Sequence, residues 1–351
     1  MLLDYSPMSE TWGHCTADNT PLRQFLKREE VQLQPVKTAT AAQRLNTVFD
    51  NFIVGSDQLW RHQYVHEFGT QFFLDFVEAG KRKVAYATSL GVTGASVPED
   101  FRSIVSILLQ HFDAISVREF SGIEELKRLY GVESVQTLDP VFLPGANFWQ
   151  NIANSSSPKF ADKNYALAYI LDKEEATQHG LSDILQSRHD ESILITDYEK
   201  PLTQAEAPQY ATILNQISPY EWLAAIANCK FMLTDSFHGA CFAIIFNKPF
   251  LCLINERRGA TRFHTLQKLF PTLAHRFINT TSPLPSDLFE LNYAEVNQTI
   301  QVRREQSLCW LQQALQLPPK EHGTAAAIPP CKKPGKLRQA LFRLKQRLLS
   351  K

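Results

Sequence analysis

The most informative stretch of the 351-residue chain reads Phe231-Met232-Leu233-Thr234-Asp235-Ser236-Phe237-His238-Gly239-Ala240. An apolar strand over residues 231–234 leads into polar residues, and we expect a helix over residues 239–246. A strand that runs directly into a helix is the repeating unit of parallel α/β folds. Backbone N–H groups at such a helix start favour an anion, and Gly239 lets that anion approach closely. The stretch therefore predicts a buried parallel strand with an anion site at its carboxyl end.

His238 lies beside this anion site in the sequence. A histidine there can donate a proton to a bound group or hydrogen-bond the anion itself. The alternative is structural, with Ser236 acting only as the helix cap and His238 packing at a domain surface. The residues of this stretch alone leave both interpretations open.

The same rhythm of short apolar runs and helical patterns extends in both directions along the chain. In the first half we expect strands over residues 52–54, 84–88 and 114–117, and helices over residues 101–110 and 119–130. In the second half we expect strands over residues 165–171, 193–196, 231–234 and 250–254, and helices over residues 174–187, 219–228, 239–246, 261–269 and 292–315. The stretch 145–164 is polar and irregular, which is typical of a linker.

This pattern predicts an α/β fold with two Rossmann-like domains that face each other across a cleft. The expected N-terminal domain covers residues 1–145, and the expected C-terminal domain covers residues 160–316, with a long closing helix. Residues 317–335, rich in alanine and proline, are expected to form a linker, and residues 336–351 a basic amphipathic helix. Ligands of such folds bind at the carboxyl ends of the strands.

Five segments, in the right order, resemble the polysaccharide pyruvyl transferase family over roughly residues 49–315. These segments are residues 231–240 together with Phe52-Ile53-Val54-Gly55-Ser56-Asp57-Gln58-Leu59-Trp60, Ala85-Tyr86-Ala87-Thr88-Ser89-Leu90-Gly91, Ile115-Ser116-Val117-Arg118-Glu119-Phe120-Ser121-Gly122 and Leu138-Asp139-Pro140. The resemblance implies the two-domain glycosyltransferase-B architecture. It also implies transfer of a pyruvyl group from phosphoenolpyruvate onto sugar hydroxyls, with formation of a ketal.

The resemblance assigns roles to several residues of the chain. His238 matches the family histidine, which implies either a general acid or a clamp on the phosphate. Arg118 matches an arginine at a strand end, where it could reach the donor; its alternative role is a structural salt bridge with Glu119 or Asp139. Because the chemistry is proton transfer and substitution at carbon, we expect no metal and no cofactor besides phosphoenolpyruvate as co-substrate.

The chain departs from the family pattern in two places. Many family members have arginine where this chain has Ser236, and Arg262 is a candidate substitute at the start of the next helix. Arg262 could equally be an ordinary surface charge. Members of the family also begin with a strand, a glycine-rich loop and a helix before a segment like residues 3–7, so the first domain is expected to lack its N-terminal βα unit. The expected donor site therefore consists of Arg118, Ser236, Gly239 and Arg262.

Further candidates for the cleft follow the first-domain strands. Gly55, Ser56 and Asp57 come directly after residues 52–54 and are candidates for contacts with phosphate or sugar, although Asp57 could instead cap a helix. Asp139, which precedes Pro140, is either a turn residue or a base. Trp60 either stacks on a sugar or belongs to the core.

The charge distribution is uneven although the net charge is zero, with 36 Lys and Arg against 36 Asp and Glu. Eight basic residues and no acidic one fall in residues 332–351, which leaves a net charge of −8 on residues 1–331. A neutral chain with an acidic body argues against nucleic-acid binding. The basic helix either lies on an anionic membrane, near a lipid-linked sugar acceptor, or docks onto the acidic body; we favour the membrane.

The scattered cysteines and the lack of a signal peptide favour a cytoplasmic protein with reduced thiols, peripheral on the inner face of the membrane. Three functions remain as hypotheses. The first is pyruvyl transfer to a precursor of a polysaccharide or cell-surface glycan. The second is glycosyl transfer from a nucleotide sugar in the same architecture, and the third is an inactive family relative that acts as a membrane-associated assembly partner.

Overall fold

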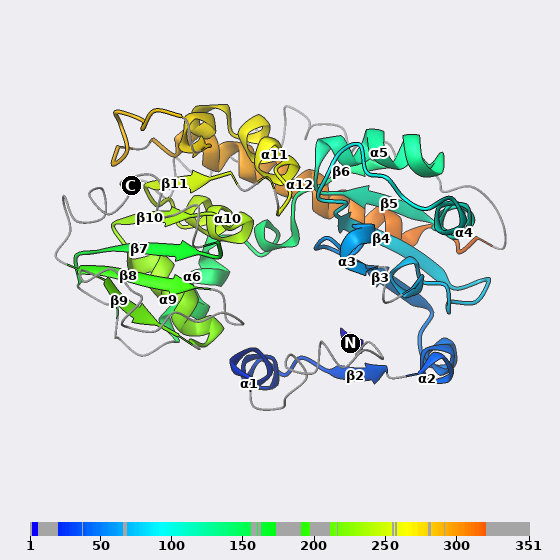
Figure 1. Cartoon of the computed structure of the whole chain (residues 1–351). Helices are drawn as coiled ribbons and strands as arrows, with labels where there is room; N and C mark the ends of the chain where they lie inside the picture. The colour runs from blue at the N-terminus through cyan, green and yellow to red at the C-terminus, as the bar shows by residue number, and fades with distance from the viewer. Residues whose placement is uncertain are drawn as a thin grey trace, which may run out of the picture.

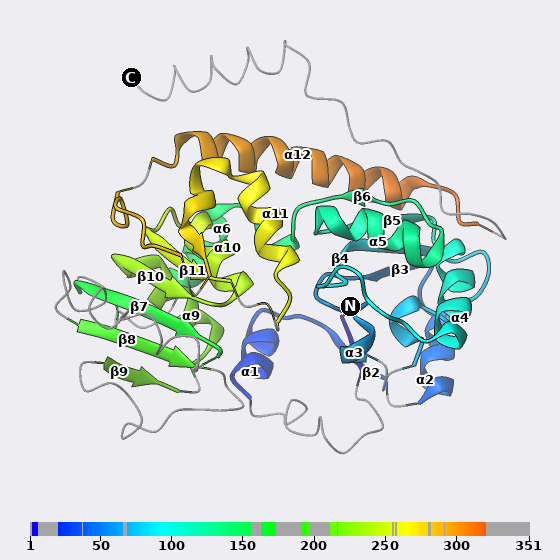
Figure 2. The same cartoon turned by 45° about the horizontal axis from the view of Figure 1, so that its top comes forward.

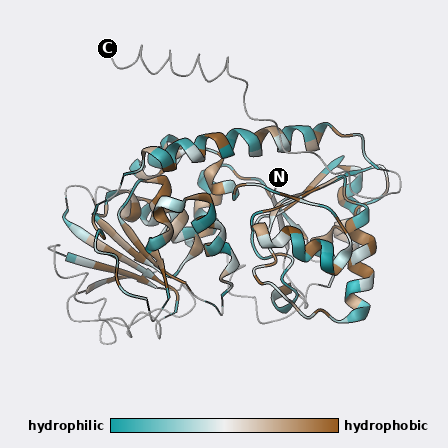
Figure 3. Ribbon diagram, turned by 90° about the horizontal axis from the view of Figure 1, so that it is seen from above, coloured by the Kyte–Doolittle hydropathy of each residue, from teal (hydrophilic) through white to brown (hydrophobic). Residues whose placement is uncertain are grey.

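The computed structural model describes residues 2–5, 20–36, 38–65, 69–155, 160, 163–172, 191–196, 211–215, 217–254, 256, 258–279, 282–290 and 292–320. Two separate parallel sheets, each covered by helices, form two Rossmann-like domains that lie side by side (Figure 1). The α/β class and the two-domain arrangement expected from the sequence are thus confirmed. Figure 3 shows the same division by hydropathy, with apolar strands enclosed between more polar helices.

The N-terminal domain is built on a four-stranded parallel sheet in the order β3-β4-β5-β6. The strands are β3 (Asn51–Val54), β4 (Arg82–Thr88), β5 (Ala114–Val117) and β6 (Val135–Gln136). Helices α4 (Glu99–Gln110) and α5 (Phe120–Tyr130) pack together. Ala85 belongs to the core cluster that these helices share, whereas Val84 and Tyr86 pack with the C-terminal helix on the opposite face. Because both faces are covered, β4 is an almost continuous apolar run.

The C-terminal domain is built on a six-stranded parallel sheet in the order β12-β11-β10-β7-β8-β9. Its strands are β7 (Tyr165–Ile170), β8 (Glu191–Thr196), β9 (Ala211–Leu214), β10 (Phe231–Thr234), β11 (Phe250–Leu253) and β12 (Phe277–Ile278). Its helices include α9 (Pro219–Asn228), α10 (Phe237–Ile245) and α11 (Thr261–Leu269). Helix α9 begins with the expected capping box, in which Ser218 and Glu221 cap each other's backbone. Strand β10 pairs with β7 on one side and β11 on the other, and this central position explains why all four of its residues are apolar or buried.

Two expected boundaries are wrong. The stretch expected to be a linker contains a helix, α6 (Ala146–Asn154), that packs against α9 with Ile152 and Ala153 buried. Its asparagines obscure the helical pattern, and packing against α9 and against Phe242 of α10 stabilises it. Helix α10 begins at Phe237 rather than at Gly239, because Ser236 adopts the extended conformation of an N-cap and accepts from the backbone.

The N-terminal segment forms a unit of its own. Strand β1 (Leu2–Tyr5) pairs in parallel with β2 (Leu33–Val36), and the two form a separate two-stranded sheet. Helix α1 (Pro21–Arg28) reaches the other domain, where the Phe25 ring lies 4.9 Å from that of Tyr220 on α9. Within the described residues β3 is therefore an edge strand of its sheet.

The last helix, α12 (Ala294–Gln316), connects the two domains (Figure 2). Val296 near its start belongs to the C-terminal core, whereas Trp310 and Ala314 pack on β4 of the N-terminal domain. Arg82 Nε donates to the carbonyl of Leu317 at 2.8 Å. The expected assignment of this helix to the C-terminal domain alone is therefore wrong, and the chain from 317 to 320 is bound to the first domain rather than free as a linker.

Three cysteines, Cys229, Cys241 and Cys252, are free and buried, as expected. Cys309 is disulfide-bonded, which contradicts the expectation that all thiols are reduced. Among the helices of the described residues, none combines the length and the apolar character needed to cross a bilayer. The helix expected over residues 174–187 and the basic helix over residues 336–351 lie outside the described residues.

Candidate active site

Residues from both domains form a cluster of charged side chains at the carboxyl ends of the strands, where the domains meet. The N-terminal domain contributes the loop after β3, the end of β5 and the loop after β6, and the C-terminal domain contributes the starts of α10 and α11. The members of this interdomain cluster are Asp57, Arg118, Glu119, Asp139, Phe237, His238 and Arg262. The structure thus brings together five of the nine residues proposed for the site from the sequence, from segments more than 200 residues apart.

Arg118 is the centre of this cluster and is almost fully buried. Its guanidinium nitrogens lie 2.8 Å from Asp139 Oδ2, 3.3 Å from Glu119 Oε1 and 3.3 Å from Asp57 Oδ1. Burial alone would lower the pKa of Arg118, but the three carboxylates raise it above its ordinary value. The salt bridges that the sequence offered as an alternative role for this arginine are therefore present.

Asp139 has two functions at once. Its Oδ1 accepts from the backbone N–H of Val141 at 3.1 Å, which caps a short helical turn, so the turn role is confirmed. Its Oδ2 faces Arg118 and lies 3.8 Å from His238 Nε2. Burial alone would raise the pKa of Asp139, but His238 and Arg118 outweigh burial and hold it well below its ordinary range. Asp139 is therefore a fixed negative charge behind the His238 ring.

His238 is the accessible member of the cluster. It follows the N-cap of α10, and 38% of its side chain is exposed, compared with 2% for Asp139. The Asp139 carboxylate on one side orients the imidazole, while the other side of the ring remains open to a ligand. A half-exposed histidine backed by a buried carboxylate is the arrangement that a general acid or base requires.

Arg262 is the second buried arginine, and its environment differs from that of Arg118. Its Nε and one terminal nitrogen donate only to backbone carbonyls, those of Gly259 at 3.3 Å and Arg258 at 2.8 Å. Within the part of the chain that the structure describes, no carboxylate lies within ion-pair distance of it. Burial and the nearby Arg118 lower the pKa of Arg262 to about 10. The interpretation of Arg262 as an ordinary surface charge is therefore wrong, because only 8% of the residue is exposed.

Phe237 contacts both arginines, and it was not identified as part of the site from the sequence. The guanidinium carbons of Arg118 and Arg262 lie 4.7 Å and 5.4 Å from the centroid of its ring. A cation over an aromatic face is attracted by the ring quadrupole, so the ring holds both guanidiniums. The aromatic residue between Ser236 and His238 was the available signal.

Glu119 is the other residue whose part in the site the sequence understated. Its Oε1 accepts from Ser89 Oγ and from Arg118 Nε, whereas its Oε2 is buried without a hydrogen-bond partner in the described residues. Burial raises the pKa of Glu119 above its ordinary value of 4.5, although Arg118 acts in the opposite direction. The carboxyl is therefore easier to protonate than an exposed one.

Ser236 and Gly239 have structural roles. Ser236 Oγ accepts from the backbone N–H of Gly239 at 3.3 Å, so the capping alternative is confirmed and this amide already has a partner. A Cβ added at Gly239 would lie 2.4 Å from Thr234 Oγ1, which shows that glycine is needed for close packing of α10 against β10. We had expected Gly239 to allow the approach of an anion; the contact seen here is instead with the strand.

The three candidates after β3 differ in position. Ser56 Oγ lies 3.5 Å from Asp139 Oδ2, and Asp57 contacts Arg118 with two thirds of its own side chain exposed. Asp57 Oδ1 also accepts from the adjacent N–H of Gln58 at 2.8 Å. Burial alone would raise the pKa of Asp57, but Arg118 and His238 outweigh burial and lower the pKa below its ordinary value. Both residues thus face the interdomain cluster, whereas Gly55 has a different function.

Gly55 is the point at which the loop after β3 approaches the neighbouring strand. Its φ is +136°, and an added Cβ would lie 1.9 Å from the carbonyl oxygen of Tyr86 on β4. We expect Gly55→Ala to lower the free energy of unfolding by at least about 2 kcal/mol, because a strained backbone and a steric overlap add together. Urea denaturation measures the change.

A matched control for this prediction is Gly94→Ala. Gly94 also has a positive φ, +65°, but an added Cβ would meet nothing within 4 Å. This variant is expected to lose only about 1 kcal/mol, the usual cost of a side chain in the left-handed region. Equal losses for the two variants would show that the contact with Tyr86 has no effect.

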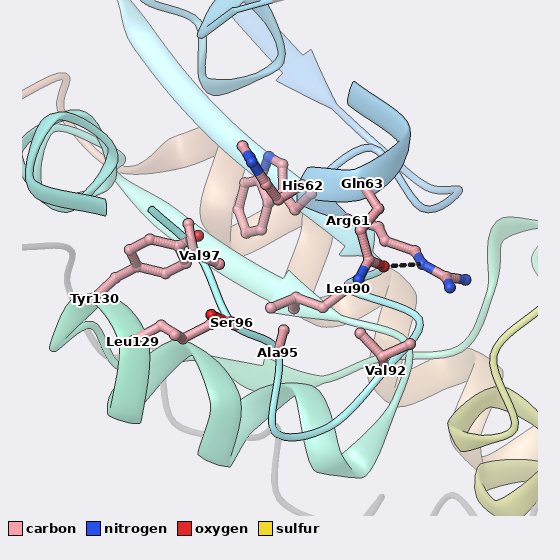
Figure 4. A pocket seen from close by; sticks show the side chains of 11 residues that line it. Arg61, His62, Gln63, Leu90, Val92, Ala95, Ser96, Val97, Leu129 and Tyr130 are labelled. Carbon is pink, nitrogen blue, oxygen red and sulfur yellow. Dashed lines mark hydrogen bonds between the residues drawn. The ribbon is translucent and has the colours of Figure 1, made fainter. Parts of the chain in front are cut away.

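Two cavities of the structure lie near the residues proposed for the site from the sequence. The smaller lies inside the N-terminal domain, between His62 on α3 (His62–Val65) and Tyr130 on α5 (Figure 4). Its volume of about 10 Å³ holds no more than one water. Trp60, which lines it, is 2% exposed and stacks on Phe73 at 5.6 Å, so Trp60 belongs to the core and does not bind sugar. The larger cavity lies at the domain interface, beside α11.

Several solved structures are similar to this chain at low identity. A putative UDP-N-acetylglucosamine 2-epimerase from Listeria monocytogenes has 14% identity and a TM-score of 0.46, covering 84% of this chain and 86% of the other. The UDP-GlcNAc 2-epimerase from Neisseria meningitidis, bound to UDP-GlcNAc, has 12% identity and a TM-score of 0.47, with 83% and 87% covered. The ADP-heptose lps heptosyltransferase II of E. coli has 12% identity and a TM-score of 0.31, with 82% and 87% covered.

Sequence comparison gives a more specific result. No curated protein matches the chain significantly. The model of the family described as polysaccharide pyruvyl transferase matches residues 3–257, which is most of the chain and includes every member of the interdomain cluster except Arg262. The two facing Rossmann-like domains also agree with the glycosyltransferase-B-like fold expected of that family. The chain therefore belongs to the polysaccharide pyruvyl transferase family.

Proposed function

We propose that the protein transfers a pyruvyl group from phosphoenolpyruvate to two hydroxyls of a sugar in a polysaccharide or cell-surface glycan precursor. A proton adds to the enol methylene, one sugar hydroxyl attacks the adjacent carbon, and the bond from that carbon to the phosphate oxygen breaks. The second hydroxyl then attacks the same carbon. Each hydroxyl gives up its proton, and the products are inorganic phosphate and a cyclic pyruvate ketal.

The observation that carries this proposal is the state of Arg262. A buried guanidinium without a carboxylate partner in the described residues, next to a second buried arginine, has a lowered pKa and lacks full charge compensation. An anion placed there restores the balance, and phosphoenolpyruvate supplies both a carboxylate and a phosphate. Arg262 is thus the proposed donor ligand that replaces the arginine absent at Ser236.

The other cluster residues support Arg262 in this scheme. Arg118 adds a positive charge from the N-terminal domain and forms an ion pair with Asp139. Helix α10 begins at the cluster with Ser236 and Gly239, so the positive end of its dipole is proposed to face the donor. His238 is the proposed proton donor, because it is the exposed group of the cluster and its Nε2 lies 3.8 Å from the buried Asp139 carboxylate. Ser56 and Asp57 face the acceptor side. The scheme uses no metal and no cofactor.

The acceptor is proposed to be a glycan or a lipid-linked sugar. The lipid of such an acceptor would place it at an anionic membrane surface. Residues 332–351, with eight basic residues and no acidic one, would bring the enzyme to the same surface. This combination supports a peripheral location on the cytoplasmic face of the membrane.

The test is titration of the full chain with phosphoenolpyruvate by calorimetry, followed by assay of phosphate release with sugar acceptors. We expect Arg262→Gln to weaken phosphoenolpyruvate binding about 10- to 100-fold, because a charge-assisted hydrogen bond contributes about 1.5–3 kcal/mol. Arg102→Gln, which removes an exposed arginine on α4, is the control and should leave binding unchanged.

Two outcomes would contradict the proposal. The first is no binding of phosphoenolpyruvate by the folded chain, and the second is binding that Arg262→Gln does not alter. Stabilisation in a thermal-shift assay by a nucleotide sugar, but not by phosphoenolpyruvate, would favour glycosyl transfer instead.

A further inference from the structure

A cavity of about 350 Å³ lies at the domain interface where α11 meets the start of α5. The N–H of Phe120 on α5 donates to Thr265 Oγ1 on α11 at 3.2 Å, so one cross-domain hydrogen bond borders it. Its volume is within the range of small-molecule sites, roughly 300–1,000 Å³. None of the residues of the interdomain cluster lines it, so it is distinct from the proposed donor site.

One wall of the cavity is a single face of α11. Thr261, His264, Thr265 and Lys268 follow the spacing that places side chains on the same side of a helix. Lys268 Nζ lies 4.4 Å from the centroid of the Phe120 ring, which also lines the cavity. This contact holds the ammonium group at the wall although the side chain is exposed.

The positive character of this wall has further sources. Helices α5 and α11 both begin at the cavity. The first amide of α5 already donates to Thr265 Oγ1, whereas α11 has no side-chain cap on its N-terminus. Thr261 Oγ1 is buried and has no hydrogen-bond partner in the described residues. The uncapped start of α11, one lysine and an unused hydroxyl together favour a phosphate group.

Other residues of the lining are suited to a polyol. Thr93 and Ser121 contribute hydroxyls, and Glu256 contributes a carboxylate that accepts hydrogen bonds. A carboxylate in the lining disfavours a bare anion, but it is a good partner for sugar hydroxyls. The lining therefore combines groups that bind phosphate with groups that bind hydroxyls.

We propose that this cavity binds a sugar that carries a phosphate group. The position of the cavity makes it the acceptor site, an assignment that rests on the proposed function. Phe120 directly follows Glu119 and Thr261 directly precedes Arg262, so the cavity adjoins the donor groups through two consecutive pairs of residues. The bound sugar is the acceptor, and Lys268 is the residue that selects a phosphorylated one.

The test is calorimetric titration of the full chain with glucose 1-phosphate as the probe, in parallel with glucose and with inorganic phosphate. We expect glucose 1-phosphate to bind more tightly than either, and Lys268→Gln to weaken it at least about tenfold through loss of a charge-assisted contact. Thr261→Val is expected to weaken binding to a smaller extent. Lys127→Gln, an exposed lysine at the other end of α5, should change nothing.

Equal affinity of the wild type and Lys268→Gln for glucose 1-phosphate would overturn the proposal, as would an affinity no higher than that for inorganic phosphate. A phosphoenolpyruvate titration of the same Lys268→Gln protein separates this result from the donor question. If phosphoenolpyruvate does not bind while glucose 1-phosphate binds through Lys268, the proposed function fails and the sugar phosphate site remains. If phosphoenolpyruvate binds but glucose 1-phosphate does not, only the sugar phosphate site is lost.

Discussion

Arg118→Ala is expected to lower the free energy of unfolding by about 3–5 kcal/mol, the usual cost of removing one partner from a buried ion pair. The reason is that Asp139 and Glu119, both about 1–4% exposed, lose their principal cation, and Asp139 keeps only His238 beside it. A buried carboxylate without a partner is unfavourable to ionise, so part of the loss appears as proton uptake. Urea denaturation at neutral pH measures the effect.

The matched control is Arg102→Ala. Arg102 pairs with Glu99 on the surface of α4, where both side chains are exposed, and removal of an exposed pair costs less than about 1 kcal/mol. Arg118→Lys keeps the charge and is expected to recover part of the stability, because one ammonium cannot reach three carboxylates in the geometry of a guanidinium. If Arg118→Ala loses no more than Arg102→Ala, the cluster is not a stabilising network.

His238→Ala is expected to reduce the turnover of phosphoenolpyruvate about 10²- to 10⁴-fold, the range that general acid–base catalysis contributes. Because more than a third of the side chain is exposed, the same substitution should change the free energy of unfolding by less than about 1 kcal/mol. Phosphate release under saturating donor measures turnover, and calorimetry measures donor binding separately.

His275→Ala is the control for this substitution. His275 is also partly exposed and also faces a carboxylate, Asp287, at 3.2 Å, but it lies outside the interdomain cluster. It should retain full turnover. Unchanged turnover in His238→Ala would remove this residue from the mechanism, whereas weak donor binding with normal turnover at saturation would make it a clamp on the phosphate rather than an acid.

The elements that the sequence predicted well are those determined by local patterns. Strand β10 was predicted to the residue, because four apolar residues are followed by polar ones, and α9 because its capping box marks its start. Helix α6 was missed because its stability depends on packing against α9 and α10. Helix α1 was missed although Thr20 caps it and Pro21 is its first residue. The path of α12 from one domain to the other has no local signal at all.

The candidate site divides in the same way. Arg118 and His238 could be singled out because each comes after an expected strand, and the carboxyl ends of parallel strands meet at one edge. Asp139 was identified through the family-like segment 138–140. The mutual contacts of these residues could not be derived, because a contact between Asp139 and His238 depends on how two separate domains pack. The lack of a carboxylate partner for Arg262 and the contact of Phe237 with both arginines are likewise properties of that interface.

By itself the sequence determined the α/β class, the two-domain organisation, the family and most of the residues that line the interface. The fold class and the domain organisation follow from hydrophobic periodicity and from caps and glycines, which act within a few neighbouring residues. The family and the site residues follow from the resemblance of ordered segments to that family. Only the tertiary structure decided which arginine is neutralised by carboxylates and which remains available to an anion. That distinction depends on burial and on charges from segments distant in the chain, and neither is encoded in any local pattern.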